Sequence, residues 1–202
     1  MEALLPRFRA AHTQVLGVSV DSIYCHVNWG QSMGGVSFPL LADFQPKGAT
    51  AAAYGHYLAE PGITDRATVV IDKDGIVRHS SSVTPAGQRD IGDLAALCES
   101  VDGEFGQGLA AFPAPQGLPG GARMFVKSHC GHSRAAILTR DNLHLQEGLP
   151  LSNVSEDSSA RDELVKLAGS DQAPALLCDG KVMHEAADIS RFLVNAATDL
   201  PA

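Results

Sequence analysis

The sequence predicts an α/β protein built from two domains, and two features of the chain indicate this. Short apolar segments typical of strands alternate with amphipathic segments typical of helices in both halves of the chain. Between the halves, residues 103–121 combine glycines with prolines and hold few periodic apolar residues, which is typical of a linker. We therefore expect a first domain at residues 1–102 and a second domain at residues 122–202.

The elements of the first domain follow from the spacing of its apolar residues. Asp21 and Ser22 are typical helix caps, and residues 73–75 (Lys-Asp-Gly) are typical of a tight turn between two strands. In chain order we expect a helix at 2–12, a buried strand at 15–20, a helix after Ser22, an extended segment at 38–43, an alanine-rich helix at 51–58, strands at 67–72 and 76–79, and a helix at 89–101.

The second domain has an equally regular pattern. In chain order we expect a strand at 124–126, a helix at 130–144, a strand at 149–154, a helix at 159–168, a strand at 175–178, a turn at 179–180, a strand at 181–184 and a helix at 188–195. This succession of strands and helices resembles the minimal thioredoxin-type fold.

The composition narrows the classes of function. Hydrophobic residues make up 45% of the 202 residues, which is enough for a buried core in each domain. The formal net charge is −8 and no lysine or arginine cluster stands out, which argues against nucleic acid and membranes as partners. The first residues do not form a basic region followed by an apolar stretch, so we expect a cytoplasmic protein.

Cys130 is the candidate catalytic residue. It follows an apolar strand and a short turn and lies in the first turn of a predicted helix, where the helix dipole and unpaired N–H groups favour a thiolate. A thiolate is the form that attacks disulfides and peroxides. Although His129 and His132 flank this cysteine, we expect no metal site, because neighbours at a helix start rarely converge on one ion.

The other three cysteines are expected to be structural. None lies two residues from another, which excludes a C-x-x-C dithiol and a zinc ribbon. Cys98 and Cys178 lie in apolar patterns and are expected to act as small buried hydrophobes, and Cys25, on a predicted helix, is also expected to be buried by packing. Whether Cys25 or Cys98 resolves a disulfide stays open at this point.

The second domain resembles a glutaredoxin or the N-terminal domain of a glutathione transferase. Lys127 precedes Cys130 by three residues, as in the glutaredoxin pattern K-x-x-C, and Cys130 begins a C-G-H-S tetrapeptide similar to the monothiol motif C-G-F-S. Pro174 matches the position of the family's cis proline. An Asp-Gly pair followed by Glu185 and Ala186 is placed like the D-G…E-S run of the transferases.

The resemblance implies glutathione as a co-substrate, with no tightly bound cofactor. Ala173, next to the cis proline Pro174, would offer its N–H and C=O groups to glutathione as an added strand. Lys127 would attract a glutathione carboxylate. The helix that begins near Glu185 and Ala186 would offer backbone N–H groups to the γ-glutamyl carboxylate. Ala186 departs from the transferase pattern because it lacks a hydroxyl.

The first domain resembles peroxiredoxins of the AhpC/TSA type, from about residue 3 to residue 101. The segments that carry the resemblance are V-L-G-V-S-V-D-S at 15–22, F-P-L-L-A-D at 38–43 and R-A-T-V-V-I-D-K-D-G at 66–75. The resemblance implies that Arg66 is catalytic: it would lie beside the peroxidatic thiolate, lower the pKa of that thiol and polarise the peroxide. It also implies a homodimer.

The peroxiredoxin segment that holds the peroxidatic cysteine, P-x-x-x-[ST]-x-x-C, and the strand before it are absent from the sequence. In a thioredoxin-type sheet that strand lies between the counterparts of residues 15–20 and 68–71. We therefore expect a first domain that is incomplete at its N-terminus, in a fragment or truncated gene product whose Met1 is internal to a helix. The chain is then expected to lack peroxidase turnover of its own.

Together these features predict a peroxiredoxin–glutaredoxin hybrid for glutathione-linked reduction of hydroperoxides. Ser133 replaces the second cysteine of dithiol glutaredoxins, so a mixed disulfide on Cys130 would be resolved by glutathione or by another thiol. Tethering the two parts raises the effective concentration of the reductant. Two alternatives stay open: a glutathione transferase-like module that activates glutathione, and a non-catalytic scaffold of two thioredoxin-type folds.

Overall fold

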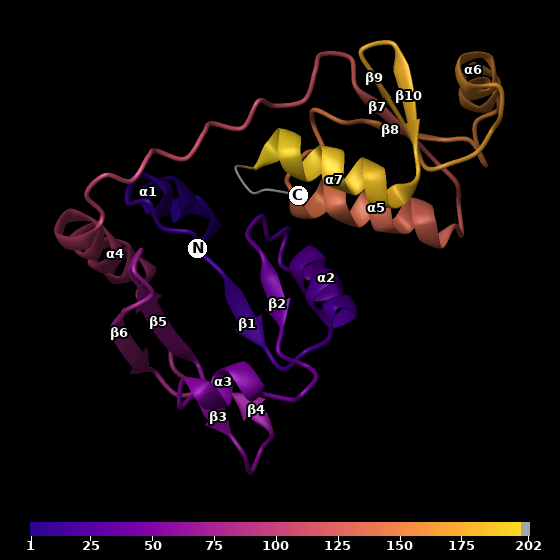
Figure 1. Cartoon of the computed structure of the whole chain (residues 1–202). Helices are drawn as coiled ribbons and strands as arrows, with labels where there is room; N and C mark the ends of the chain where they lie inside the picture. The colour runs from indigo at the N-terminus through magenta and orange to yellow at the C-terminus, as the bar shows by residue number, and fades with distance from the viewer. Residues whose placement is uncertain (199–202) are drawn as a thin grey trace. The chain divides into compact units, whose positions relative to one another are not determined.

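Figure 1 shows the computed structural model of the chain, which describes residues 1–198. Its internal contacts divide it into two units. Unit 1 comprises Met1–His26 and Phe38–Phe112, and unit 2 comprises Val27–Ser37 and the chain from Pro113 onward. The division in the glycine- and proline-rich region was expected, whereas the assignment of Val27–Ser37 to unit 2 was not.

Unit 1 contains short strands and helices. In chain order these are a 3-10 turn (Glu2–Leu4), α1 (Leu5–Ala10), β1 (Gly17–Ser19), β2 (Leu40–Ala42), α3 (Ala49–Ala53), β3 (Tyr57–Leu58), β4 (Ile63–Thr64), β5 (Ala67–Ile71), β6 (Val77–Ser82) and α4 (Ile91–Phe105). Helix α2 (Ile23–Ser32) begins in unit 1 and ends in the segment assigned to unit 2. Ser22 caps α2 as expected, since its Oγ accepts from the Cys25 N–H at 3.3 Å.

The strands of unit 1 form separate two-stranded sheets. β1 pairs with β2 in parallel, and β5 pairs with β6 antiparallel. Among the described residues, no strand pairs with both β1 and β5. The strand predicted at 15–20 is present as β1, but the prediction that it is buried is wrong, because Leu16 and Val18 are 52% and 39% exposed. A two-stranded sheet offers too few neighbours to bury both of its faces.

The core of unit 1 lies where α1 and α4 pack on β5. Phe8 of α1, Val70 of β5 and Cys98 of α4 are buried there, which confirms Cys98 as a small buried hydrophobe. An ion pair between Arg7 and Glu99, at 2.8 Å, also joins α1 to α4. The packing therefore depends on three segments that are distant in the sequence.

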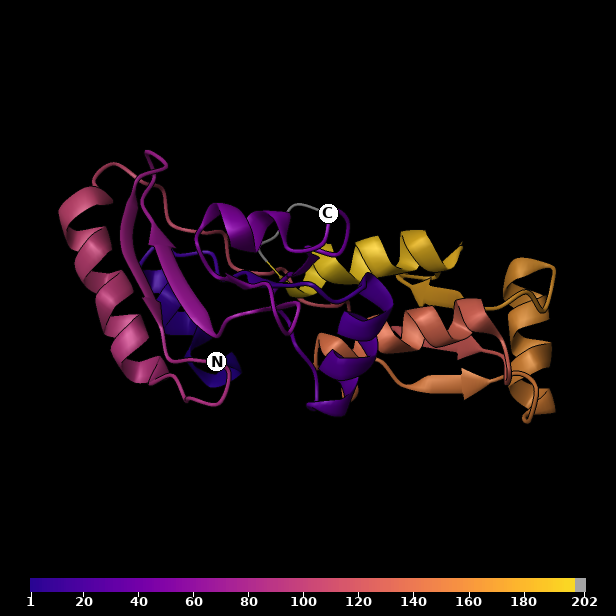
Figure 2. The same cartoon turned by 90° about the horizontal axis from the view of Figure 1, so that it is seen from below.

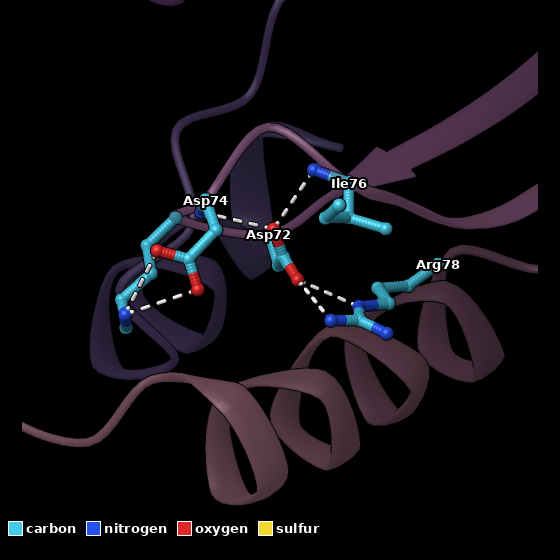
Figure 3. A network of polar contacts seen from close by, with 5 residues as sticks. Asp72, Asp74, Ile76 and Arg78 are labelled. Atoms are coloured by element: carbon cyan, nitrogen blue, oxygen red, sulfur yellow. Dashed lines mark hydrogen bonds and ion pairs between the residues drawn. The ribbon is translucent and has the colours of Figure 1, made fainter.

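A buried carboxylate fixes the turn between β5 and β6 (Figure 3). Asp72 accepts hydrogen bonds from the N–H groups of Asp74 and Ile76, both at 2.9 Å, and from the Arg78 side chain at 2.6 Å. Burial opposes the charge of Asp72, but these hydrogen bonds outweigh it and lower the pKa of the carboxyl. Arg78 also lies 3.5 Å from the centre of the Phe105 ring. The turn predicted at 73–75 is thus confirmed.

Two helix ends in unit 1 differ from the prediction. The helix predicted at 51–58 ends at Ala53, since Gly55 adopts a left-handed φ of 74° that stops the helix, and Tyr57–Leu58 then forms strand β3. The last helix continues to Phe105, where the Arg78 side chain stacks on the ring. The linker predicted from residue 103 therefore begins too early.

Unit 2 follows the predicted order of elements, with ends that differ by at most two residues. Its elements are β7 (Arg123–Val126), α5 (Gly131–Asn142), β8 (Leu151–Asn153), α6 (Ser158–Ala168), β9 (Ala175–Cys178), β10 (Lys181–His184) and α7 (Ala186–Ala197). The strands form one sheet in the order β10-β9-β7-β8. β7 runs parallel to β8 and antiparallel to β9.

Helices cover both faces of this sheet, as Figures 1 and 2 show. Met124 of β7 packs with Ile189 of α7 and with Ala136 of α5 on one face. Phe125, the next residue, packs with Leu164 of α6 on the other face. The alternation of side chains along β7 explains why three successive residues, 124–126, are all buried. In the part of the chain that the structure describes, no helix is both long enough and apolar enough to span a membrane.

Candidate active site

The candidate site lies at the start of α5 in unit 2. Cys130 is the residue immediately before the helix, with extended φ and ψ of −100° and 118°. The preceding turn contains His129 in a left-handed conformation, with φ of 56°. In this geometry the N–H of Ser133 points at Cys130 Sγ from 3.5 Å. The predicted succession of strand, turn and helix therefore places the thiol at the unpaired N–H groups of the helix.

The pKa of the Cys130 thiol is lowered from that of an ordinary cysteine. The main cause is the hydrogen bond from the Ser133 N–H, followed by the Ser133 side chain. The His132 N–H and the charge of Lys127 act in the same direction, while burial opposes them. Cys130 is only partly buried, so a thiolate here is open to reaction.

The remaining cysteines have different surroundings. Burial raises the pKa of Cys98 and of Cys178, as expected for thiols that pack as hydrophobes. Cys25 is exposed, with Sγ 3.7 Å from Asp21 Oδ1, so the prediction that it packs in the interior is wrong. Helix α2 places this residue on its solvent side.

Ser133 links the thiol to the end of β7. Its side chain is fully buried, and its Oγ accepts a hydrogen bond from the Lys127 N–H at 3.0 Å. The same residue donates its own N–H to Cys130 Sγ. The sequence indicated only that Ser133 replaces a second cysteine, and its role in holding this turn was missed.

A second loop approaches the thiol from the strand β9. The peptide bond between Ala173 and Pro174 is cis, as the resemblance implied. The Ala173 carbonyl oxygen lies 3.9 Å from Cys130 Sγ, within reach of the S–H of the protonated form. Cys130 and Ala173, which are 43 positions apart in the sequence, thus meet at this sulfur atom, in the arrangement that the resemblance implied.

Lys127 is placed at this site, but it already has an acidic partner. Its Nζ lies 3.1 Å from Asp171 Oδ2, on the loop that leads to Pro174. The next residue, Gln172, donates from Nε2 to Glu185 Oε1 at 3.4 Å. These contacts bring the loops around residues 127–130, 171–174 and 185–186 together. Asp171 was missed by the sequence analysis, because nothing in the spacing of the sequence links it to Lys127.

The two predicted site residues at the start of α7 also lie here. Glu185 precedes the helix with a left-handed φ of 69°, and Ala186 is its first residue. The unpaired N–H groups of the first turn of α7 therefore lie next to Glu185, whose side chain accepts from Gln172.

Arg66 lies in unit 1, at the head of β5. Its Nε donates to the Pro85 carbonyl at 3.1 Å. Nearby, Arg89 donates to the Ala67 carbonyl at 2.6 Å. Burial, together with the charge of Arg66, lowers the pKa of Arg89. Two guanidinium groups thus gather at this end of the β5–β6 hairpin.

Within residues 1–198, no group of three or more His, Cys, Asp or Glu side chains is arranged to hold a metal ion. The site at Cys130 consists of its thiol, the backbone N–H donor of Ser133 and the ion pair of Lys127 with Asp171. This arrangement suits nucleophilic attack by sulfur on a disulfide.

Comparison with known proteins gives an independent view of the first part of the chain. The model of the AhpC/TSA family matches residues 1–80. Alkyl hydroperoxide reductase E of Mycobacterium tuberculosis is 38% identical over 86 residues, which cover 43% of this chain and 56% of that protein. The chloroplastic 2-Cys peroxiredoxin BAS1 of Arabidopsis thaliana is 34% identical over 80 residues, covering 37% of this chain and 29% of that protein. The chain spans about half or less of the length of these relatives.

Solved structures show a similar partial match. The mitochondrial 2-Cys peroxiredoxin of Plasmodium falciparum gives a TM-score of 0.46 at 26% identity, over 54% of this chain and 66% of that one. AhpC of Mycobacterium tuberculosis gives a TM-score of 0.46 at 24% identity, over 49% of this chain and 59% of that one. The first 80 residues thus form a peroxiredoxin-like segment by sequence, as predicted.

Proposed function

We propose that the protein is a thiol oxidoreductase that links hydroperoxide reduction to glutathione, with Cys130 as its reactive thiol. The observation that carries the proposal is the position of Cys130 Sγ, which is partly exposed and accepts the Ser133 N–H at the start of α5. The peroxiredoxin-like sequence of residues 1–80 supports the assignment of the oxidant as a hydroperoxide. The chain then joins a peroxidase-type segment to a glutathione-dependent reductase.

The chemistry proceeds by thiol–disulfide exchange. The scheme begins at the peroxidatic thiolate of a peroxiredoxin, a group that none of the four cysteines in this sequence is assigned to supply. A hydroperoxide oxidises that thiolate to a sulfenic acid and leaves as an alcohol, and glutathione condenses with the sulfenic acid to give a mixed disulfide and water. The Cys130 thiolate attacks the glutathione sulfur of that disulfide, so the peroxidatic sulfur leaves as a thiolate and Cys130 becomes glutathionylated. A second glutathione thiolate then attacks the glutathione sulfur on Cys130 and releases oxidised glutathione.

Each predicted site residue receives a role in this scheme. Ala173 presents its backbone beside the thiol, where the extended peptide of glutathione is proposed to add as a strand. Lys127 is proposed to attract a carboxylate of glutathione. The start of α7, at Glu185 and Ala186, is proposed to bind the γ-glutamyl group. Pro174 holds Ala173 in place through the cis bond.

Arg66 belongs to the peroxidase part of the proposal. A guanidinium beside a peroxidatic thiolate lowers the pKa of that thiol and polarises the peroxide. Because the matched segment 1–80 contains Cys25 alone among the cysteines, and its Sγ faces the Asp21 carboxylate, we do not assign Cys25 this role. The proposed reaction suits a homodimer in a reducing compartment such as the cytoplasm, where thiols stay reduced.

The test is a deglutathionylation assay on a glutathionylated peptide, with Cys130→Ser as the variant. We expect the variant to lose activity entirely, because a serine hydroxyl does not exchange with disulfides. Cys178→Ser is the matched control, since its thiol lies in the same unit but has a raised pKa. This control is expected to keep wild-type activity. Retained activity in Cys130→Ser contradicts the thiol mechanism and favours transferase-type activation of glutathione.

Alkylation by iodoacetamide across a range of pH separates the enzyme from a scaffold. If Cys130 is catalytic, its alkylation midpoint lies below the ~8.5 of a free cysteine. A midpoint at or above that of a free cysteine favours a non-catalytic scaffold. Mass spectrometry of the Cys130 peptide gives the rate for this residue alone.

A further inference from the structure

Three loops that border the Cys130 turn carry a carboxylate, while Lys127 is the charged group that acts on the thiol itself. On the loop that precedes α6, Glu156 accepts from Ser128 Oγ at 2.5 Å, two residues before the thiol. On the loop before β9, Asp171 pairs with Lys127. At the start of α7, Glu185 accepts from Gln172. Along its own turn and helix, His129 and His132 flank the thiol. Each loop that reaches the site thus contributes a carboxylate.

The pairing of Lys127 with Asp171 weakens the electrostatic attraction between this lysine and an incoming anion. Its Nζ lies 3.1 Å from Asp171 Oδ2, and the two side chains are 34% and 48% exposed. A pair this exposed contributes little to the stability of the fold. Its two opposite charges nevertheless cancel over distances beyond the pair. An anion that approaches Cys130 therefore meets Glu156 and Glu185 without the full attraction of a free lysine.

We propose that Asp171 is a specificity-determining residue for Cys130: by pairing with Lys127, it weakens the attraction of anionic groups to the thiol. The site then favours mixed disulfides flanked by neutral or basic residues over those flanked by acidic residues. The site also binds the carboxylate of glutathione less tightly than it would if Lys127 had no acidic partner. This inference rests on the proposed function, since it takes Cys130 as the reacting sulfur.

Charge-selective alkylation of Cys130 tests the proposal directly. Iodoacetate and iodoacetamide form the same bond to sulfur and release iodide, but only iodoacetate carries a negative charge. The rate ratio of the two reagents at Cys130 therefore measures the local electrostatic potential and cancels differences in thiolate content. We expect Asp171→Asn to raise this ratio roughly threefold, the size expected for one unit charge at several ångströms in water-like surroundings.

Three further variants make the result specific. Lys127→Met is expected to lower the ratio by a similar factor, and Lys127→Met combined with Asp171→Asn is expected to return it to the wild-type value. Glu163→Gln is the matched control, because Glu163 of α6 is a partly exposed carboxylate that pairs with Arg123 of β7. It is expected to leave the ratio unchanged. Asp171→Ser replaces Asp171→Asn if the latter does not fold.

The outcomes distinguish this inference from the proposed function. A ratio in Asp171→Asn equal to that in Glu163→Gln overturns the role of Asp171, whatever the absolute rate. A slow iodoacetamide reaction of wild-type Cys130, no faster than that of the exposed Cys25 at neutral pH, instead contradicts the proposed function.

Glutathionylated peptides extend the test to the substrate class. Two peptides that differ only in acidic or basic residues beside the modified cysteine are compared by kcat/KM. We expect the wild type to prefer the basic peptide several-fold and Asp171→Asn to lose most of that preference. An equal preference in both proteins overturns the proposed selectivity.

Discussion

Ser133→Ala removes one oxygen atom that serves both the fold and the thiol. Ser133 is fully buried, and its Oγ accepts the Lys127 N–H at 3.0 Å. Without that oxygen, a backbone N–H at the end of β7 loses its partner, which costs about 1–3 kcal/mol. In a unit of about 100 residues, 1 kcal/mol corresponds to roughly 4–8 °C in the melting temperature. We therefore expect unit 2 to melt at a temperature lower by several degrees.

The same change acts on the thiol in a graded way. The Ser133 side chain is the second cause of the lowered pKa of Cys130, after the Ser133 N–H, which the variant keeps. We expect the midpoint pH of Cys130 alkylation to be higher in the variant than in the wild type, but still lower than that of a free cysteine. Differential scanning calorimetry measures the first effect, and iodoacetamide labelling of the Cys130 peptide measures the second.

Ser190→Ala is the control for Ser133→Ala. Ser190 Oγ lies 2.9 Å from Thr139 Oγ1 between α7 and α5, so its loss affects packing in the same unit without touching the thiol. It is expected to lower the melting temperature and to leave the alkylation midpoint of Cys130 unchanged. Unchanged melting and an unchanged midpoint in Ser133→Ala would refute the assignment of Ser133 to both roles.

Three other substitutions test the fold. Asp157→Ala removes the side chain that caps α6 by accepting two backbone N–H groups, and we expect a loss of about 0.5–2 kcal/mol in urea unfolding. Leu164→Ala leaves a cavity at a fully buried site and is expected to cost about 2–5 kcal/mol in the same assay. The pKa of Asp72 is lower in the folded state than the ordinary aspartate pKa of about 3.9. Its ionisation therefore stabilises the folded state at pH values above about 3.9, and this contribution is lost as the pH falls through the pKa of the folded state. Wild type is therefore expected to lose stability between neutral and acidic pH more steeply than Asp72→Asn, and equal slopes in urea titrations contradict this.

Unit 2 could be predicted from the sequence because its signals are local. Each helix has a cap or an apolar period of its own, as with Asp157 before α6, and Gly169 adopts the left-handed φ of 74° that ends the same helix. The position of Cys130 before α5 depends on the same kind of signal. Ala173 and Pro174 were found through a family resemblance that one short segment of the sequence carries.

The partners of the site could not be predicted in this way. Asp171 reaches Lys127 only because the sheet places β7 next to β9, and no spacing between the two residues encodes that contact. The exposure of side chains in unit 1 could not be predicted from the sequence either. An apolar strand such as β1 indicates a preference for burial, but whether Val18 is buried depends on what packs above it. The exposed position of Cys25 on α2 escaped prediction for the same reason.

The burial of Ser133 also constrains how the proposed reaction ends. In a dithiol site the residue at this position supplies the second sulfur, but here its side chain is enclosed and holds the Lys127 N–H. A disulfide on Cys130 must therefore be resolved by a thiolate that arrives from solvent. Glutathione carries a net negative charge at neutral pH, so it meets the same carboxylates that the first substrate meets. If Asp171 weakens the attraction of anions, it slows this second attack as well, and Asp171→Asn should accelerate turnover most at low glutathione concentration.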